Sequence, residues 1–308
     1  MAHTENRKWL VRPAWEDMVR KTTFLGVVPL LAPVQLLLLV VVILPSIYVV
    51  WLSFHVSSFG QTPEFTGWSN YLRVLSDPAF RSAMWNTIVI VVVAVHLEML
   101  VALGMALLFN SGIPFRRILL VAVLAPYAVS EVVAVAMWRF LFDLDIGPIT
   151  LLMQGLGLPI LEWSFDPIDA TVMIILLTIW MHLPFTFVIL YAARLAMPSD
   201  LYEAARIDGA TRMQCFWRVT LPLMGPAILV ALLFRYIFAF RMFSEVWLLT
   251  GGGPARSTEV VAVYLYQEAF SYNAFGTASA TALLMVAASL VLASGYIWLL
   301  RRQVKNAR

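Results

Sequence analysis

Long runs of apolar residues alternate with short polar segments along most of the chain. A helix needs about 20 apolar residues to cross a bilayer. Runs of that size cover residues 30–54, 84–109, 118–141, 170–195, 222–248 and 277–300. The apolar stretch that starts at Phe24 exceeds a signal-peptide core, so we expect it to be retained as a span. The pattern predicts an all-α integral membrane protein with six transmembrane helices.

Basic residues gather in alternate segments between these runs. They lie at Arg7, Lys8, Arg12, Arg20, Lys21, Arg116, Arg117, Arg194, Arg206, Arg212, Arg218, Arg301, Arg302, Lys305 and Arg308. The intervening 142–169 segment is acidic and has no Lys or Arg. Because positive charge favours the cytoplasmic side, we expect both termini there. Tails at 1–23 and 301–308 would then flank a membrane domain at 24–300.

Composition excludes several classes of protein. Hydrophobic residues make up 61% of the chain and charged residues 13%, against roughly 45–50% and 25% in soluble domains. No basic block is interleaved with aromatic residues, so we expect no nucleic-acid partner. The histidines are scattered without metal-ligand spacing, and Gly251–Pro254 lacks the Lys of a phosphate-binding loop. We therefore expect no catalytic residue, metal or cofactor in this chain.

Charged and polar residues also lie within the apolar runs, where they are costly. These residues are His96, Glu98, Ser130, Glu131, His182, Arg235, Arg241 and Glu245. Arg241 and Glu245 are four positions apart, so a helix would place them on one face, where they can pair. The group could line a polar translocation pathway or form interhelical ion pairs. Because these polar residues lie at similar depths in four spans, a translocation pathway is favoured for the group as a whole. For His96 and His182 taken singly, a hydrogen-bonded role between helices is favoured over a ligand role.

The polar 198–222 segment predicts a hairpin of two short helices. Asp200 would cap the first helix, and Gly209 would end it in a left-handed conformation. Thr211 and Gln214 form the capping box of a second helix, which Pro222 would end. One side of the second helix would carry Met213, Phe216, Trp217 and Thr220. Such a hairpin could lie on lipid, serve as a plain connection or dock onto another protein.

Its sequence, EAARIDGATRMQCFWRVTLPLMGP from Glu203, resembles the EAA loop of the membrane subunits of bacterial ABC importers. Val219 replaces the Ile of that pattern and is the one departure from it. The resemblance implies the type I importer permease fold, in which a cytoplasmic helix–glycine–helix loop couples the permease to an ATPase. The coupling residues it implies are Glu203, Ala204, Ala205, Arg206, Asp208, Gly209, Leu221 and Pro222.

A second stretch, FRMFSEVWLLTGGGPARSTEVVAVYLYQEAF from Phe240, is similar to maltose-type sugar permeases, although the extra N-terminal spans and large outer domain of the maltose subunit are lacking. The resemblance implies a subunit of the bacterial inner membrane that supplies half of a sugar pathway. The implied partners are a second homologous permease, two cytoplasmic ATPases that bind ATP and Mg, an extracytoplasmic sugar-binding protein, and lipid. The implied substrate contacts are Arg241, Glu245 and Trp247, followed by Arg235, Glu131 and His182.

The arginine-rich usage and the loop pattern also resemble actinobacterial trehalose importers, so the expected substrate is a disaccharide such as trehalose or a maltose-like sugar. A glycerol-phosphate or sugar-ester importer is the nearest alternative, because Arg235 and Arg241 could bind a phosphate. An ion-coupled transporter using Glu98, Glu131 and His182 would require internal repeats that the six runs do not show. A membrane enzyme would have only the acidic 142–169 segment for its site.

Overall fold

The computed structural model describes residues 31–306, and the chain divides into two compact units after Leu52. In the first unit, a π-helical turn η1 (Leu39–Ile43) leads into α2 (Leu44–Ser53). The whole helical run Leu31–Ser53 is long and apolar enough to cross a membrane. The first predicted span is therefore confirmed over its described part, whereas the predicted 1–23 tail lies outside the described residues.

The second unit opens with a short hairpin and the longest helix of the described residues. Strand β1 (His55–Val56) pairs antiparallel with β2 (Glu64–Phe65) and is followed by α3 (Ser69–Ser76) and α4 (Pro78–Asn110). The Asp77 carboxylate accepts a 2.8 Å hydrogen bond from the Ala79 amide, and Pro78 takes the first helical position. Such a start is favourable for a helix. It places the beginning of α4 before residue 84, where the predicted span began.

The third predicted span is broken rather than continuous. Helix α5 (Arg116–Leu124) ends in a 3₁₀ turn, η2 (Ala125–Ala128), and α6 (Glu131–Leu141) leaves at an angle of 106°. Pro126 lies in the turn, and the backbone at Ser130 is extended so that its hydroxyl accepts a hydrogen bond from Val133 N. The described chain thus has five membrane-crossing candidates, or six if the bent pair counts as one.

The fifth predicted span begins and ends earlier than expected. A continuous helical run, Arg212–Ala239, comprises α10 (Arg212–Cys215), the π-helical turn η3 (Phe216–Thr220) and α11 (Leu221–Ala239). Pro222 does not end a helix, contrary to the prediction. The π turn widens the hydrogen-bond register just ahead of it, so a residue without an N–H is accommodated. After Ala239 the chain turns and resumes as α12 (Ser244–Leu249).

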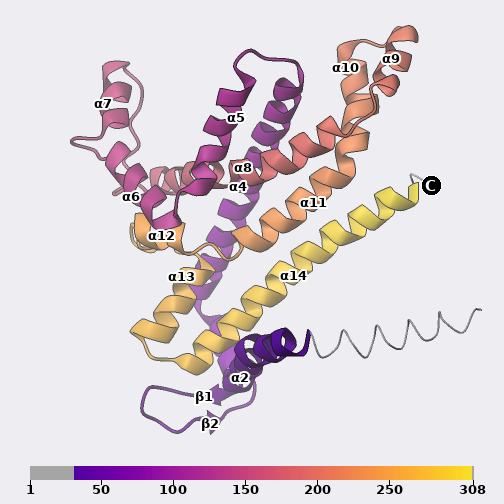
Figure 1. The fold of residues 1–308 in the computed structure, drawn as a ribbon. Helices are drawn as coiled ribbons and strands as arrows, with labels where there is room; N and C mark the ends of the chain where they lie inside the picture. Colours follow the sequence, from indigo (N-terminus) through magenta and orange to yellow (C-terminus); the bar gives the residue numbers. More distant parts are fainter. Residues whose placement is uncertain (1–30, 307–308) are drawn as a thin grey trace, which may run out of the picture. The chain divides into compact units, whose positions relative to one another are not determined.

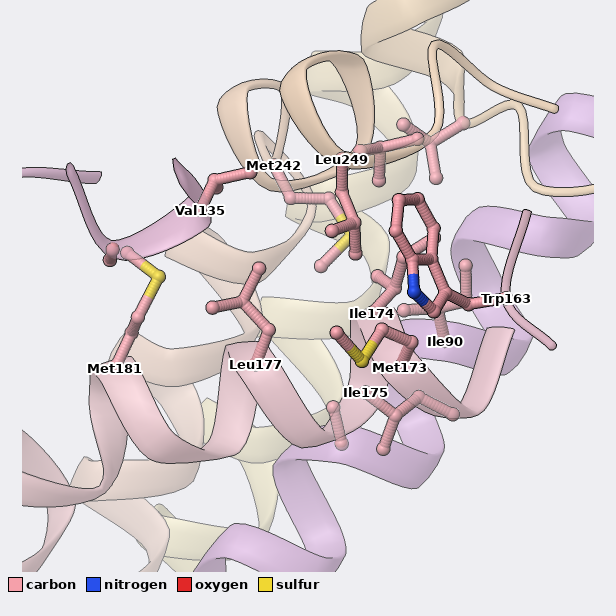
Figure 2. Close-up of a cluster of buried hydrophobic side chains, with 14 of the residues drawn as sticks. Ile90, Val135, Trp163, Met173, Ile174, Ile175, Leu177, Met181, Met242 and Leu249 are labelled. Atoms are coloured by element: carbon pink, nitrogen blue, oxygen red, sulfur yellow. The ribbon is translucent and has the colours of Figure 1, made fainter. Parts of the chain in front are cut away.

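The remaining helices pack around these elements. They are α7 (Pro148–Gly155), α8 (Pro167–Leu195), α9 (Asp200–Ile207), α13 (Val261–Tyr266), η4 (Gln267–Ser271) and α14 (Phe275–Asn306), which includes most of the predicted 301–308 tail. Helix α4 packs along α8, and α14 packs along α11 (Figure 1). In Figure 2, Leu177 and Met181 of α8 point toward Val135 and Met242 within a buried apolar cluster. This cluster fixes α6 and α12 against α8.

Candidate functional site

A cavity of about 480 Å³ opens where α6, α8, α11 and the turn before α12 meet. Its lining comprises Pro126, Tyr127, Val129, Glu131, Met181, His182, Phe185, Arg235, Phe238, Arg241, Met242, Phe243, Ser244 and Glu245. Five of the six implied substrate contacts are among them. The sixth, Trp247, packs against Phe243 and Tyr266, with ring centroids 5.9 and 4.9 Å apart. His96, Glu98 and Ser130 are not part of the lining.

Arg235 reaches the cavity wall with its charge already paired. Its Nε donates to both carboxylate oxygens of Glu98 at 2.9 Å, and its Nη2 donates to Glu98 Oε2 at 2.7 Å. The Thr186 hydroxyl of α8 also donates to Glu98. Arg235 is 2% exposed and Glu98 is fully buried. The contact therefore ties α4, α8 and α11 together and leaves this part of the wall electrically neutral.

Glu245 pairs with a different residue from the one predicted. Its Oε1 lies 3.2 Å from His182 Nε2, and its side chain is almost fully buried. The expected pairing with Arg241 is wrong, because Arg241 lies in the turn that separates α11 from α12 and the two residues do not share a helix. In residues 31–306, Arg241 and Glu131 are exposed and form no ion pair.

Aromatic rings form much of the remaining wall. Phe185 and Phe238 meet edge to face, with centroids 6.0 Å apart, and Tyr127 and Phe243 lie nearby on the lining. Sequence analysis did not select these aromatic residues, because an aromatic residue in an apolar run has the same pattern whether it faces core, lipid or cavity. Their helical spacing relative to the polar lining residues was the one usable signal.

The other polar residues of the spans have structural roles. The Nδ1 atom of His96 lies 2.8 Å from Val92 O and 3.1 Å from Tyr236 Oη, so the predicted hydrogen-bonded histidine is confirmed. No group of three metal-ligating residues occurs in the part of the chain that the structure describes. The cavity thus combines charged side chains with aromatic rings, a lining that can hydrogen-bond and stack against a polar ligand.

The α9–α10 hairpin has the predicted turn between its helices. Gly209 adopts a φ of +75°, and the capping box forms, with Thr211 N donating to Gln214 Oε1 at 2.8 Å and Gln214 N donating to Thr211 Oγ1 at 3.3 Å. Asp200 does not cap α9 as predicted, because it is the first helical residue and Ser199 occupies the cap position.

The hairpin surface combines charged and apolar side chains. Of the residues implied to couple, Glu203, Ala204, Arg206, Asp208, Gly209 and Pro222 are exposed, and Ala205 and Leu221 are half-buried. Ile207, Met213 and Trp217 are also exposed, Ile207 by 86%. Thr220 is buried instead of joining this side, because the π turn rotates it inward. The hairpin thus presents a mixed surface suited to contact with another molecule.

The Gly251–Gly253 run shapes a tight loop. Gly251 and Gly252 have φ values of +63° and +88°, and Gly252 lies against the buried Glu259. Arg256 pairs with Glu259 through bonds of 2.6 and 2.7 Å, which raises the pKa of its guanidinium. The left-handed backbone at Gly251 and Gly252 thus accounts for glycine at these two positions.

The chain is similar in sequence to membrane subunits of binding-protein-dependent transport systems. Residues 98–305 match the family model described as the binding-protein-dependent transport system inner membrane component. The sulfoquinovosyl glycerol transport system permease of Agrobacterium fabrum is 33% identical over 94% of each chain. The trehalose/maltose transport system permease of Thermococcus litoralis is 35% identical over 86% of this chain and 88% of that protein.

Solved structures share the fold. A chain of a bacterial alginate ABC transporter, in complex with an alginate pentasaccharide-bound periplasmic protein, superposes with a TM-score of 0.80 at 21% identity. The match covers 94% of this chain and 97% of that one. A chain of the MetNI methionine ABC transporter matches with a TM-score of 0.53, 19% identity and coverage of 72% and 94%. The helices described above therefore form the type I importer permease fold.

Proposed function

Because the chain belongs to the family of binding-protein-dependent transport system inner membrane components, we propose that it forms half of the pathway for an uncharged disaccharide, such as trehalose or a maltose-like sugar. The chain is a permease subunit of a carbohydrate ABC importer, a multi-pass membrane protein and not itself an enzyme. The similarity to a trehalose/maltose permease supports this choice of sugar.

The observation that carries the proposal is the neutralisation of Arg235 by Glu98. A phosphate or sugar-ester importer would need free cations along its pathway, yet three hydrogen bonds from this guanidinium go to one carboxylate. Arg241 remains as a cation on the cavity wall, whose lining also includes the carboxylates of Glu131 and Glu245. Donors and acceptors of both signs beside aromatic rings suit a neutral ligand with many hydroxyls.

The α9–α10 hairpin is proposed as the contact with a cytoplasmic ATPase. The small side chains of Ala204 and Ala205 permit close approach, Glu203 offers a charged contact and Gly209 makes the bend. Two such ATPases would bind ATP and Mg, so this chain would need no cofactor. A second, homologous permease would complete the pathway, and an extracytoplasmic sugar-binding protein would deliver the sugar. Both chain termini would lie in the cytoplasm of a bacterial cell.

The ion-coupled alternative, which would use Glu98, Glu131 and His182, loses one of these three candidates. A proton carrier must gain and release a proton, but Glu98 is fully buried and held by Arg235 and Thr186. No other observation favours that class.

The test is ATPase activity of the purified complex with its binding protein, measured across neutral disaccharides and glycerol phosphate. Stimulation by a neutral disaccharide and none by glycerol phosphate is expected, whereas stimulation by the phosphate alone would refute the proposal. Failure of any ATPase to co-purify would refute the importer role.

Glu203→Ala should abolish uptake while the protein remains inserted, and normal uptake would contradict the coupling role of the hairpin.

A further inference from the structure

We propose that Tyr202 is the positioning residue that locks the α9–α10 hairpin to both α8 and α11, so that movement of the hairpin reaches both helices. This inference rests on the proposed coupling role of the hairpin. Tyr202 is half-buried on α9, most of whose other side chains are exposed. Of the described residues, it is the one on α9 whose side chain makes hydrogen bonds or ring contacts with neighbouring elements.

Its hydroxyl joins the hairpin to the base of α11. Tyr202 Oη lies 3.0 Å from Thr220 Oγ1, at the end of the π turn that leads into that helix. Thr220 is 4% exposed, and its hydroxyl also lies 3.4 Å from Cys215 O, on the preceding turn. Both ends of the π turn are thus connected to α9 through the Tyr202–Thr220 hydroxyl pair.

Its ring joins the hairpin to the end of α8. The Arg194 guanidinium carbon lies 4.6 Å from the centre of the Tyr202 ring, within the range of a cation–π contact. Arg194 Nε is buried without a hydrogen-bond partner, so the ring is a main partner of this charge. The segment between the two helices is also in contact with this residue, because Met197 Sδ lies 3.2 Å from Tyr202 Oη.

The two helices reached in this way both line the cavity. Helix α8 carries His182, and α11 carries Arg235 and Phe238. At 1.5 Å per residue, the contacts at Arg194 and Thr220 lie roughly 18–27 Å along the helices from these side chains. Helices commonly kink at π turns. Without the Tyr202–Thr220 contact, movement of the hairpin would bend the chain at η3 instead of displacing α11.

A tyrosine that only stabilised the local fold would affect assembly, not the coupling between ATP hydrolysis and uptake. The test therefore measures sugar molecules taken up per ATP hydrolysed, in proteoliposomes containing the complete importer with its binding protein. Tyr202→Phe and Thr220→Val each remove the hydroxyl contact with little change in volume. Tyr202→Leu also removes the ring from Arg194. Tyr272→Phe, at an exposed tyrosine, is the matched control.

We expect the coupling ratio to fall about fivefold in Tyr202→Phe and in Thr220→Val, the loss typical of one neutral hydrogen bond. The double variant should be no worse than either single one, because both remove the same contact. Tyr202→Leu should be the most uncoupled, and Tyr272→Phe should match the wild type. Unchanged ratios in the two isosteric variants would overturn the proposal even if the leucine variant failed to assemble. Absence of ATPase binding by the wild type would instead refute the proposed function.

Discussion

At the scale of single residues, the contact between Arg235 and Glu98 decides what the cavity offers a ligand. A charge at membrane depth is costly unless it is paired, and here the pair is completed by the Thr186 hydroxyl. Removing one partner leaves an uncompensated buried charge, whereas removing both leaves an apolar contact. The Glu245 carboxylate also has a partner, since its Oε1 lies 3.2 Å from His182 Nε2. Arg241 and Glu131 are the lining residues of opposite charge that remain exposed.

We predict that Glu98→Gln destabilises the protein by about 3–5 kcal/mol, because Arg235 remains buried without its carboxylate. The double variant Glu98→Gln/Arg235→Met should recover most of that loss. Thermal unfolding in detergent measures both. Equal stabilities for the single and double variants would show that the ion pair does not account for the effect.

At the scale of elements, the turn at Gly209 sets the angle between α9 and α10. Its φ of +75° is costly for any residue with a side chain, although a Cβ there would meet no atom within 4 Å. Gly60 in the loop between β1 and β2 has nearly the same φ, +77°, and equally open surroundings. Adding a side chain should therefore cost a similar amount of backbone strain at either glycine, so Gly60 serves as a matched control for Gly209.

We predict that Gly209→Ala and Gly60→Ala each cost about 1–2 kcal/mol of stability through the same backbone strain. Sugar uptake should fall only in Gly209→Ala, because only that turn orients the proposed ATPase contact. Uptake assays beside unfolding curves separate the two effects. An equal loss of uptake in both variants would mean that stability, not hairpin geometry, limits transport.

A second element-scale prediction concerns the start of α14, where Gly276 lies against the carbonyl of His55 in β1. A Cβ at this position would overlap that backbone oxygen and crowd the Asn70 side chain. We predict that Gly276→Ala destabilises the protein by about 1–3 kcal/mol, the usual range for overpacking. Gly295→Ala in the same helix, where a Cβ meets nothing within 4 Å, is the control and should be neutral or slightly stabilising.

At the scale of the whole molecule, the proposed orientation places the α9–α10 hairpin and the 142–169 segment on opposite sides of the membrane. The chain has a single cysteine, Cys215, so a Cys215→Ser background is free of other thiols. Met213 on the hairpin is 65% exposed, and Ser164 in the other segment is exposed as well. These two positions report on the two sides.

We predict that a membrane-impermeant thiol reagent labels Ser164→Cys in cells whose outer face is accessible, and labels Met213→Cys only in inverted vesicles. The positive residues near the hairpin are the physical reason, because they favour retention in the cytoplasm. Labelling of both positions from the same side would contradict the topology.

Much of the fold and part of the site followed from sequence alone. The apolar runs, the left-handed turn at Gly209 and the capping box of Thr211 and Gln214 are local features, determined by residues a few positions apart. The depth of Glu131, His182 and Arg235 within the runs likewise pointed to a shared polar site. The position of these charged residues on the cavity wall was predictable, because a charged side chain at membrane depth is costly when it faces lipid.

Only the tertiary structure decided which charges pair and where the helices break. Glu98 and Arg235 are separated by 137 positions, and no local pattern distinguishes this pair from Arg241 with Glu245. The bend at Ser130, the π turn before Pro222 and the turn after Ala239 interrupt runs that are continuously apolar in the sequence. Sequence specified the chemistry and depth of each side chain because these are local properties. Its partner depended on which helices the fold brings together.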